Sequence, residues 1–277
     1  MKQIPFTPEI VLFHHFAQKQ ANRYGTMKPL RLMLLVCLTA LIACGGGSGS
    51  QKLSGNWQIE LHNPATGALK KESGFILQSG NILAGQFLLT GGTICPGIGS
   101  AQGQVSGTNV SIAVSQVGQT ITLTGTAAGD GSNMNGNYSI LESPCGTTQV
   151  GNWMANQVAA LTGQLQATFT SSSTAGQVSH FSGSVTQGPN RGESTTTLTG
   201  SLSSTDAPCV SSASIAGQIS GTAVVLNLLS SEGVALGQFV GTMTTDAATI
   251  TGTYNVLPQS SNGCADTGNA VVSVQAT

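Results

Sequence analysis

The sequence repeats one short pattern nine times: an apolar residue, any residue, glycine, any residue and a second apolar residue. The copies are LAGQF (83–87), LTGTA (123–127), MNGNY (134–138), LTGQL (161–165), FSGSV (181–185), LTGSL (198–202), IAGQI (215–219), FVGTM (239–243) and ITGTY (250–254). Apolar and polar residues alternate around them, as half-buried β-strands require. The glycine then shares the buried face with the apolar residues, where it is costly unless the strand bends sharply or packs closely on a neighbour. The pattern predicts an all-β fold with strongly coiled, closed sheets.

The second half of the chain repeats the first at a nearly constant offset. GQVSGT at residues 103–108 returns as GQISGT at residues 217–222, and Tyr138 matches Tyr254. This is an internal duplication, with one copy at residues 54–157 and the other at residues 158–277. Each copy has room for about eight short strands. We therefore predict two tandem antiparallel meander β-barrels, with one larger barrel or sandwich built from both copies as the alternative.

Residues 27–44 have the parts of an export signal. A short basic segment precedes the apolar run LMLLVCLTALIA at residues 32–43, which is too short to span a bilayer at about 20 residues. LIAC at residues 41–44 resembles the lipobox of bacterial lipoprotein signal peptides. The resemblance implies cleavage before Cys44 and its lipidation, with acyl chains holding the protein in the cell envelope. An ordinary signal peptide followed by an incidental cysteine is the alternative.

The lipobox resemblance also divides the N-terminal part of the chain. Residues 1–26 fit no signal and precede Met27, so we interpret them as a mis-called extension, with a real cytoplasmic extension as the alternative. Residues 27–43 are then the signal peptide, and residues 44–53 are the lipidated cysteine with a flexible Gly/Ser tether. Gly45 in place of an aspartate implies sorting to the outer membrane if the host is Gram-negative.

Four cysteines remain for disulfides once the signal is removed and Cys44 is lipidated, and four cysteines allow three pairings. Equivalent positions in the two copies select Cys95 with Cys145 and Cys209 with Cys264. Each bridge contributes about 4 kcal/mol in the chain-entropy treatment of loop closure. Their wide spacing supplies no close pair for a zinc site, so we expect no metal.

The first copy opens with LSGNWQIEL at residues 53–61, which is similar to the glycine-any-tryptophan entry of lipocalin and avidin barrels, and ITGTY is similar to an avidin strand. The resemblance implies a barrel. The second copy has Leu165 in place of the tryptophan, and two tryptophans are too few for the aromatic box of a biotin binder. The aromatic residues that could line a ligand pocket are Trp57, Trp153, Tyr138 and Tyr254.

Charge and motif content point away from nucleic acids and from catalysis. From residue 44 onward, four positive side chains stand against nine acidic ones, a net charge of −5 with no basic patch. His62, which we place at a turn, and His180, on a strand beside Phe181, lie in no catalytic motif, and no Gly-x-Ser-x-Gly elbow is present. Nothing in the sequence pairs Glu60 or Glu72 with another carboxylate. We expect no enzyme, no catalytic residue and no cofactor.

Two functions fit these features. The first is a non-catalytic, lipid-anchored envelope lipoprotein that binds a small molecule, glycan or partner protein at the open ends of its barrels, where barrel pockets usually lie. The second is a structural or surface-coat lipoprotein without a dedicated ligand. A cavity beside Trp57 or Trp153 would favour the first, and solidly filled barrels would favour the second.

Overall fold

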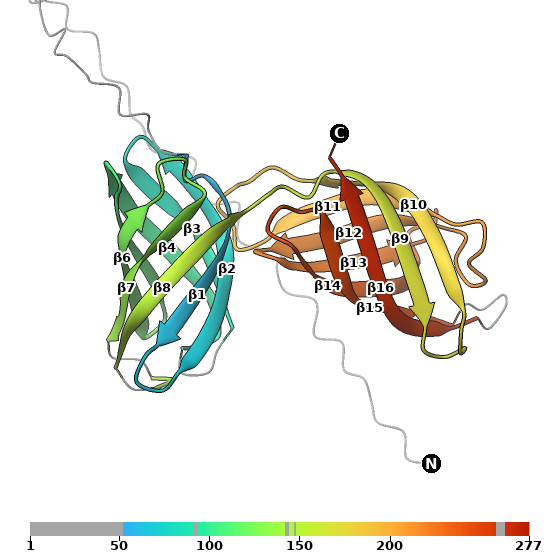
Figure 1. Ribbon diagram of the computed structural model, residues 1–277, viewed down its shortest axis with the longest axis horizontal. Coiled ribbons are helices and arrows are strands. Elements are labelled where there is room, and N and C mark those ends of the chain that lie inside the picture. The colour runs from blue at the N-terminus through green and yellow to red at the C-terminus, as the bar shows by residue number, and fades with distance from the viewer. Residues whose placement is uncertain (1–51, 91–93, 142–143, 147, 259–263, 277) are drawn as a thin grey trace, which may run out of the picture. The chain divides into compact units, whose positions relative to one another are not determined.

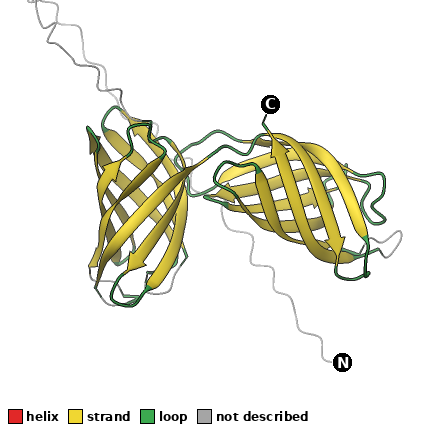
Figure 2. Cartoon of the chain, viewed as in Figure 1, coloured by secondary structure: helices red, strands yellow, loops and turns green. Residues whose placement is uncertain are grey.

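The computed structural model describes residues 52–90, 94–141, 144–146, 148–258 and 264–276. This part of the chain forms sixteen strands joined by turns and loops (Figures 1 and 2). The strands make two separate closed barrels, and every hydrogen-bonded neighbour is antiparallel and consecutive apart from the pair that closes each barrel. The predicted pair of tandem meander barrels is confirmed. The alternative of one larger barrel or sandwich is wrong, because each copy closes on itself.

Barrel 1 consists of the first eight strands and closes where β1 pairs with β8. Its strands are β1 (Gly55–Asn63), β2 (Ala68–Ser79), β3 (Ile82–Leu89), β4 (Gly97–Ser106), β5 (Asn109–Gln116), β6 (Gln119–Ala127), β7 (Asn133–Leu141) and β8 (Gln149–Val158).

Barrel 2 consists of the last eight strands and closes where β9 pairs with β16. Its strands are β9 (Gly163–Ser171), β10 (Val178–Gln187), β11 (Thr196–Ser203), β12 (Ser212–Ser220), β13 (Ala223–Leu229), β14 (Ala235–Met243), β15 (Thr249–Val256) and β16 (Asp266–Gln275).

The strand glycines allow neighbouring strands to approach closely inside each barrel. Gly125 of β6 lies directly opposite Gly136 of β7, and in barrel 2 Gly241 lies opposite Gly252. A Cβ atom on Gly125 would overlap the backbone carbonyl oxygen of Asn135. Only a residue without a side chain fits there, which explains why the repeated pattern keeps glycine on the inward face.

A leucine just before the first strand closes one end of each barrel. Leu53 and Leu161 are completely buried. The backbone N–H of Leu53 donates to Gln78 Oε1 at 2.7 Å, and that of Leu161 donates to Gln187 Oε1 at 2.9 Å. These bonds occupy equivalent places in the two copies, so the duplication includes the closed end as well as the strands. Inside barrel 1, Trp57 Nε1 donates to the carbonyl of Leu53 at 3.0 Å.

Candidate functional site

The opposite end of each barrel carries the disulfide, and we call it the stapled end. Because neighbouring strands are antiparallel, the connections that follow odd-numbered strands all lie there. Cys95, between β3 and β4, is bonded to Cys145, between β7 and β8. Cys209, between β11 and β12, is bonded to Cys264, just before β16. Both bridges are those that the repeat predicts.

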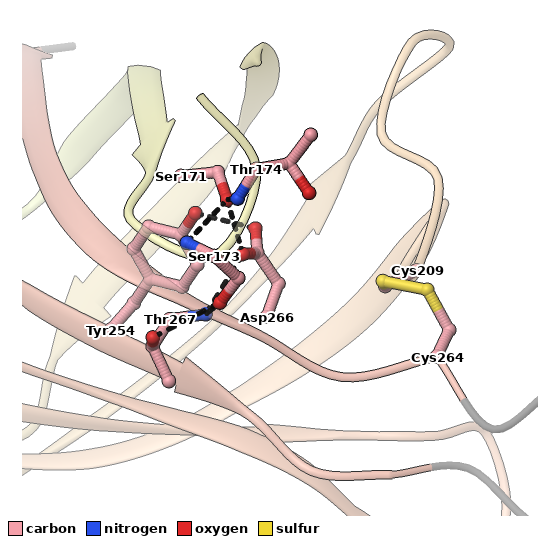
Figure 3. The surroundings of a disulfide bond; sticks show 8 residues. All are labelled: Ser171, Ser173, Thr174, Cys209, Tyr254, Cys264, Asp266 and Thr267. Carbon is pink, nitrogen blue, oxygen red and sulfur yellow. Dashed lines mark hydrogen bonds between the residues drawn. A yellow bond between two sulfur atoms is a disulfide. The ribbon is translucent and has the colours of Figure 1, made fainter. Parts of the chain in front are cut away.

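At the stapled end of barrel 2, polar side chains converge on the carboxylate of Asp266 (Figure 3). Tyr254 donates its hydroxyl to Asp266 Oδ2 at 2.7 Å, and Ser171 Oγ donates to Oδ1 at 2.6 Å. The backbone N–H groups of Ser173 and Thr174 donate to Ser171 Oγ at 3.1 and 2.9 Å. Burial, and then the bond to Asp266, raise the pKa of Tyr254 well above its ordinary value. The hydrogen bonds of this cluster connect β15, β16 and the loop after β9.

The space beside this cluster is too small for an organic ligand. Phe169, Phe181, Val210, Tyr254 and their neighbours enclose about 20 Å³, which is room for about one water molecule. The ring of Phe169 lies 4.7 Å from that of Phe181 and 4.6 Å from that of Tyr254, measured between centroids. The mouth of barrel 2 is filled by its own side chains.

His180 belongs to an exposed cluster on the outside of barrel 2. Its Nδ1 lies 2.8 Å from Asp206 Oδ2, and its backbone N–H donates to Asp206 Oδ1 at 2.9 Å. These bonds, with one from Ser204 Oγ at 2.8 Å, lower the pKa of Asp206 to about 2. The serine bonds the aspartate instead of the histidine, so the order needed to activate a serine nucleophile is not present. No sequence motif links Asp206 to His180, so this contact was not predicted.

His62 lies within β1 on the outer face of barrel 1, so its predicted place at a turn is wrong. Asn63 continues the strand beyond it, and only then does the chain turn. His62 pairs in register with Asn152 of β8. The alternation of β1, which points Leu61 inward, points His62 outward into solvent.

Glu72 is a buried carboxylate inside barrel 1. It pairs in register with Ile59, whose side chain points into the core, and it is 2% exposed. The backbone N–H of Thr90 donates to Glu72 Oε2 at 2.6 Å. Burial raises the pKa of Glu72 to about 7 against the opposing effect of the Thr90 bonds. Glu60 lies on the opposite face of the sheet, where it contacts Lys71 Nζ at 3.5 Å, so these two carboxylates do not share a site.

The four aromatic residues singled out from the sequence all lie in the barrel cores. Trp57 is 0% exposed, Trp153 is 2%, Tyr138 is 4% and Tyr254 is 5%. Trp153 lies level with Gly136 and Gly125, and its Nε1 donates to the carbonyl of Thr124 two strands away at 3.1 Å. The indole thus fills space that the glycines leave. These rings serve as packing in the structure.

A hollow of about 460 Å³ lies on the outer face of β6, β7 and β8 in barrel 1. Two rows of outward-facing residues cross the three strands and form most of its floor. The rows are Thr124, Asn137 and Asn152, and Thr122, Ser139 and Val150. Pro64, in the turn after β1, forms one edge. No residue that lines the hollow is charged. No local sequence signal marks this site, because its residues come together only across three strands.

Comparisons with known proteins leave the family open. No protein-family profile matches the chain, and no curated protein matches it. Among solved structures, it is similar to intact Ap-TbpB (N and C lobes), with 12% identity and a TM-score of 0.23 over 79% of this chain and 46% of that one. It thus spans under half the length of that protein. Kievitone hydratase from Nectria haematococca gives 11% identity and a TM-score of 0.24, covering 83% and 93% of the two chains. Likenesses this distant carry no argument about function.

The two eight-stranded barrels fit the barrel resemblance found in the sequence. Cys44 and the lipobox lie outside the described residues. Within the described ranges, no three His, Cys, Asp or Glu side chains are grouped so that they could hold a metal ion. The described part of the chain also contains no helix long and apolar enough to cross a membrane.

Proposed function

We propose that the protein is a non-catalytic, lipid-anchored lipoprotein of the cell envelope that binds its ligand or partner on the outer surface of its barrels. The observation that carries this proposal is the contrast between the barrel interiors and the outer face of barrel 1. The interiors are filled by packed side chains, including the four aromatic residues, whereas the outer face has a hollow of about 460 Å³. That volume falls in the range of ligand sites, which is about 300–1,000 Å³.

The titratable groups support a non-catalytic role. Glu72 is enclosed in a core, and its carboxylate accepts hydrogen bonds from Thr90. The His180–Asp206 pair lies exposed on the outside of barrel 2, and Ser204 bonds the aspartate. Neither arrangement places an acid, a base and a nucleophile around one point where a substrate could react.

The lipid anchor is supported by the sequence of residues 27–44. The described chain begins at Lys52, one residue before the leucine that closes barrel 1. Lys52 lies at the end of barrel 1 opposite its disulfide. The stapled end and the nearby hollow, whose edge is Pro64, lie at the other end of barrel 1 from Lys52.

A structural or surface-coat lipoprotein is the second candidate, and the filled interiors favour it. Side chains of barrel 2 form one continuous core with Phe169, Phe181 and Tyr254 at its mouth. A protein that serves only as a spacer needs such solid barrels and no hollow. Absence of any ligand for the outer face of barrel 1 would therefore favour this second function.

Metabolic labelling tests the anchor directly. The full chain is expressed in a Gram-negative bacterium with radiolabelled palmitate, beside Cys44→Ser and the matched control Cys37→Ser, which changes the other cysteine of the N-terminal region. We expect label in the parent and in Cys37→Ser, and none in Cys44→Ser. An unlabelled parent, or equal labelling of Cys44→Ser, would refute the anchor.

A further inference from the structure

We infer that the hollow on the outer face of β6, β7 and β8 binds a neutral carbohydrate. This inference deepens the proposed surface-binding function and rests on it. The hollow combines amide, hydroxyl and apolar groups on three adjacent strands of barrel 1, and this combination matches the surface of a sugar ring.

The polar groups of the hollow suit hydroxyl ligands. Each Asn amide offers two donor hydrogens and an acceptor oxygen, and each Ser or Thr hydroxyl both donates and accepts. Among the described residues, the side chains of Asn137, Asn152 and Ser139 have no hydrogen-bond partner of their own. They are therefore available to a ligand. A sugar presents several hydroxyl groups that can each donate to one side chain and accept from another.

The apolar and electrostatic character of the hollow narrows the ligand class. Val150 is 64% exposed and lies in the same row as Ser139, and Pro64 borders the hollow. The C–H face of a sugar ring can pack on such groups while its hydroxyls bond the amides. Because no lining side chain is charged, nothing there compensates the desolvation of an ionic ligand. A neutral sugar fits better than a phosphate, a carboxylate or an amine.

Barrel 2 offers an internal comparison, because several of the equivalent positions carry different residues there. Asn137 is replaced by Thr253, Val150 by Thr267 and Thr122 by Gln238. Gln238 Nε2 donates to Asn227 Oδ1 at 2.9 Å, and the Thr267 hydroxyl shares a hydrogen bond with Ser173 Oγ at 3.3 Å. Gln238 and Thr267 are thus each bonded to another side chain of barrel 2, whereas no such bond to a described residue engages Thr122, the barrel 1 residue equivalent to Gln238.

The closed barrel fixes the backbone beneath the site. Each row is fixed by the register of β6, β7 and β8 in a closed barrel. Gly151, which lies between Val150 and Asn152, lets β8 approach β1 so closely that a Cβ there would overlap the carbonyl oxygen of His62. A backbone that is already in place loses little conformational entropy when a ligand binds, which raises affinity.

A glycan array tests the inference with the detergent-extracted mature protein. The array carries neutral oligosaccharides from β-glucan, chitin, mannan and galactan, together with polygalacturonate and chondroitin sulfate as acidic comparators. We expect binding to at least one neutral oligosaccharide, which is then titrated by calorimetry. Asn137→Ala combined with Asn152→Ala should weaken that binding at least tenfold. The matched control, Thr253→Ala combined with Asn269→Ala, changes the equivalent positions of barrel 2 and should alter affinity less than twofold.

Three results would overturn the inference: no neutral oligosaccharide binds, only acidic glycans bind, or the two double variants have equal affinity. Tryptophan fluorescence, with Trp153 on β8, verifies that each variant keeps barrel 1 folded. The outcome is separate from that of the palmitate experiment, because soluble sugar binding does not depend on lipidation. If the protein is labelled with palmitate but binds no neutral sugar, the lipid anchor stands and only the carbohydrate site is refuted.

Discussion

Replacing Glu72 with glutamine should stabilise barrel 1 above neutral pH, and the gain should shrink as the pH falls. Glu72 is 2% exposed, and burial raises its pKa from 4.5 to about 7. The folded barrel therefore holds a proton that the unfolded chain releases more readily. The protonated Glu72 therefore contributes to the free energy of unfolding. This contribution is fully present below pH 4.5 and is lost as the pH rises through about 7, the pKa of Glu72 in the folded barrel. Glutamine resembles the protonated form, keeps an oxygen that can accept from Thr90, and does not titrate.

The size of the effect follows from the two pKa values. Each unit of difference corresponds to about 1.4 kcal/mol. Between pH 5 and pH 8, the parent should lose about 2 to 3 kcal/mol of unfolding free energy through Glu72, and Glu72→Gln should lose none of it. The stability gap between variant and parent should widen by that amount. Barrel 2 carries the apolar Phe181 at the position equivalent to Glu72. Its core therefore has no buried carboxylate at this position that loses stability as the pH rises.

Urea denaturation followed by tryptophan fluorescence measures this gap. The two tryptophans of the chain, Trp57 and Trp153, both lie in barrel 1, so the signal reports that barrel alone. Glu60→Gln removes a carboxylate from the outer face of the adjacent strand and serves as the control for the loss of one charge. A gap between Glu72→Gln and the parent that stays constant from pH 5 to pH 8 would refute the reasoning.

Three further changes test other parts of the structure. Gly125→Ala should lower the stability of barrel 1 by about 1–3 kcal/mol, since its Cβ overlaps a backbone carbonyl; unchanged tryptophan-monitored unfolding would contradict the close strand approach. Cys145→Ser should cost barrel 1 about 4 kcal/mol in the same assay, and no loss would mean that the bridge does not form. Tyr254→Phe removes a bond to Asp266 and should cost barrel 2 about 1.5–3 kcal/mol by circular dichroism. The equivalent Tyr138→Phe should lower the stability of barrel 1 by less. A larger loss from Tyr138→Phe than from Tyr254→Phe would contradict the role given to the Tyr254–Asp266 bond.

The fold was predictable because its signals are local and repeated. Alternation gives the strands, and the glycine pattern gives the coiled, closed sheets. The duplication also determined the disulfides, because equivalent positions left one pairing that satisfies both copies. His62 was misplaced at a turn, since the sequence does not mark whether a strand continues through a polar residue near its end.

The candidate site was not predictable, because it depends on register between strands distant in sequence. Glu72 follows Lys70 and Lys71, a pattern typical of a solvated charged run. Its register with Ile59, which the local sequence does not show, places it on the inward face. Asn137 and Asn152 are ordinary exposed residues in their own strands. They become neighbours because β7 and β8 pair with these residues opposite each other.

Intact-mass spectrometry of the protein extracted from membranes tests the central claim most directly. We expect a chain that begins at Cys44 and carries the mass of a diacylglycerol and one further acyl group. Reduction should then add the mass of four hydrogens, two for each of the bridges Cys95–Cys145 and Cys209–Cys264. An unmodified polypeptide that begins at residue 1 would contradict the account of where this protein is held.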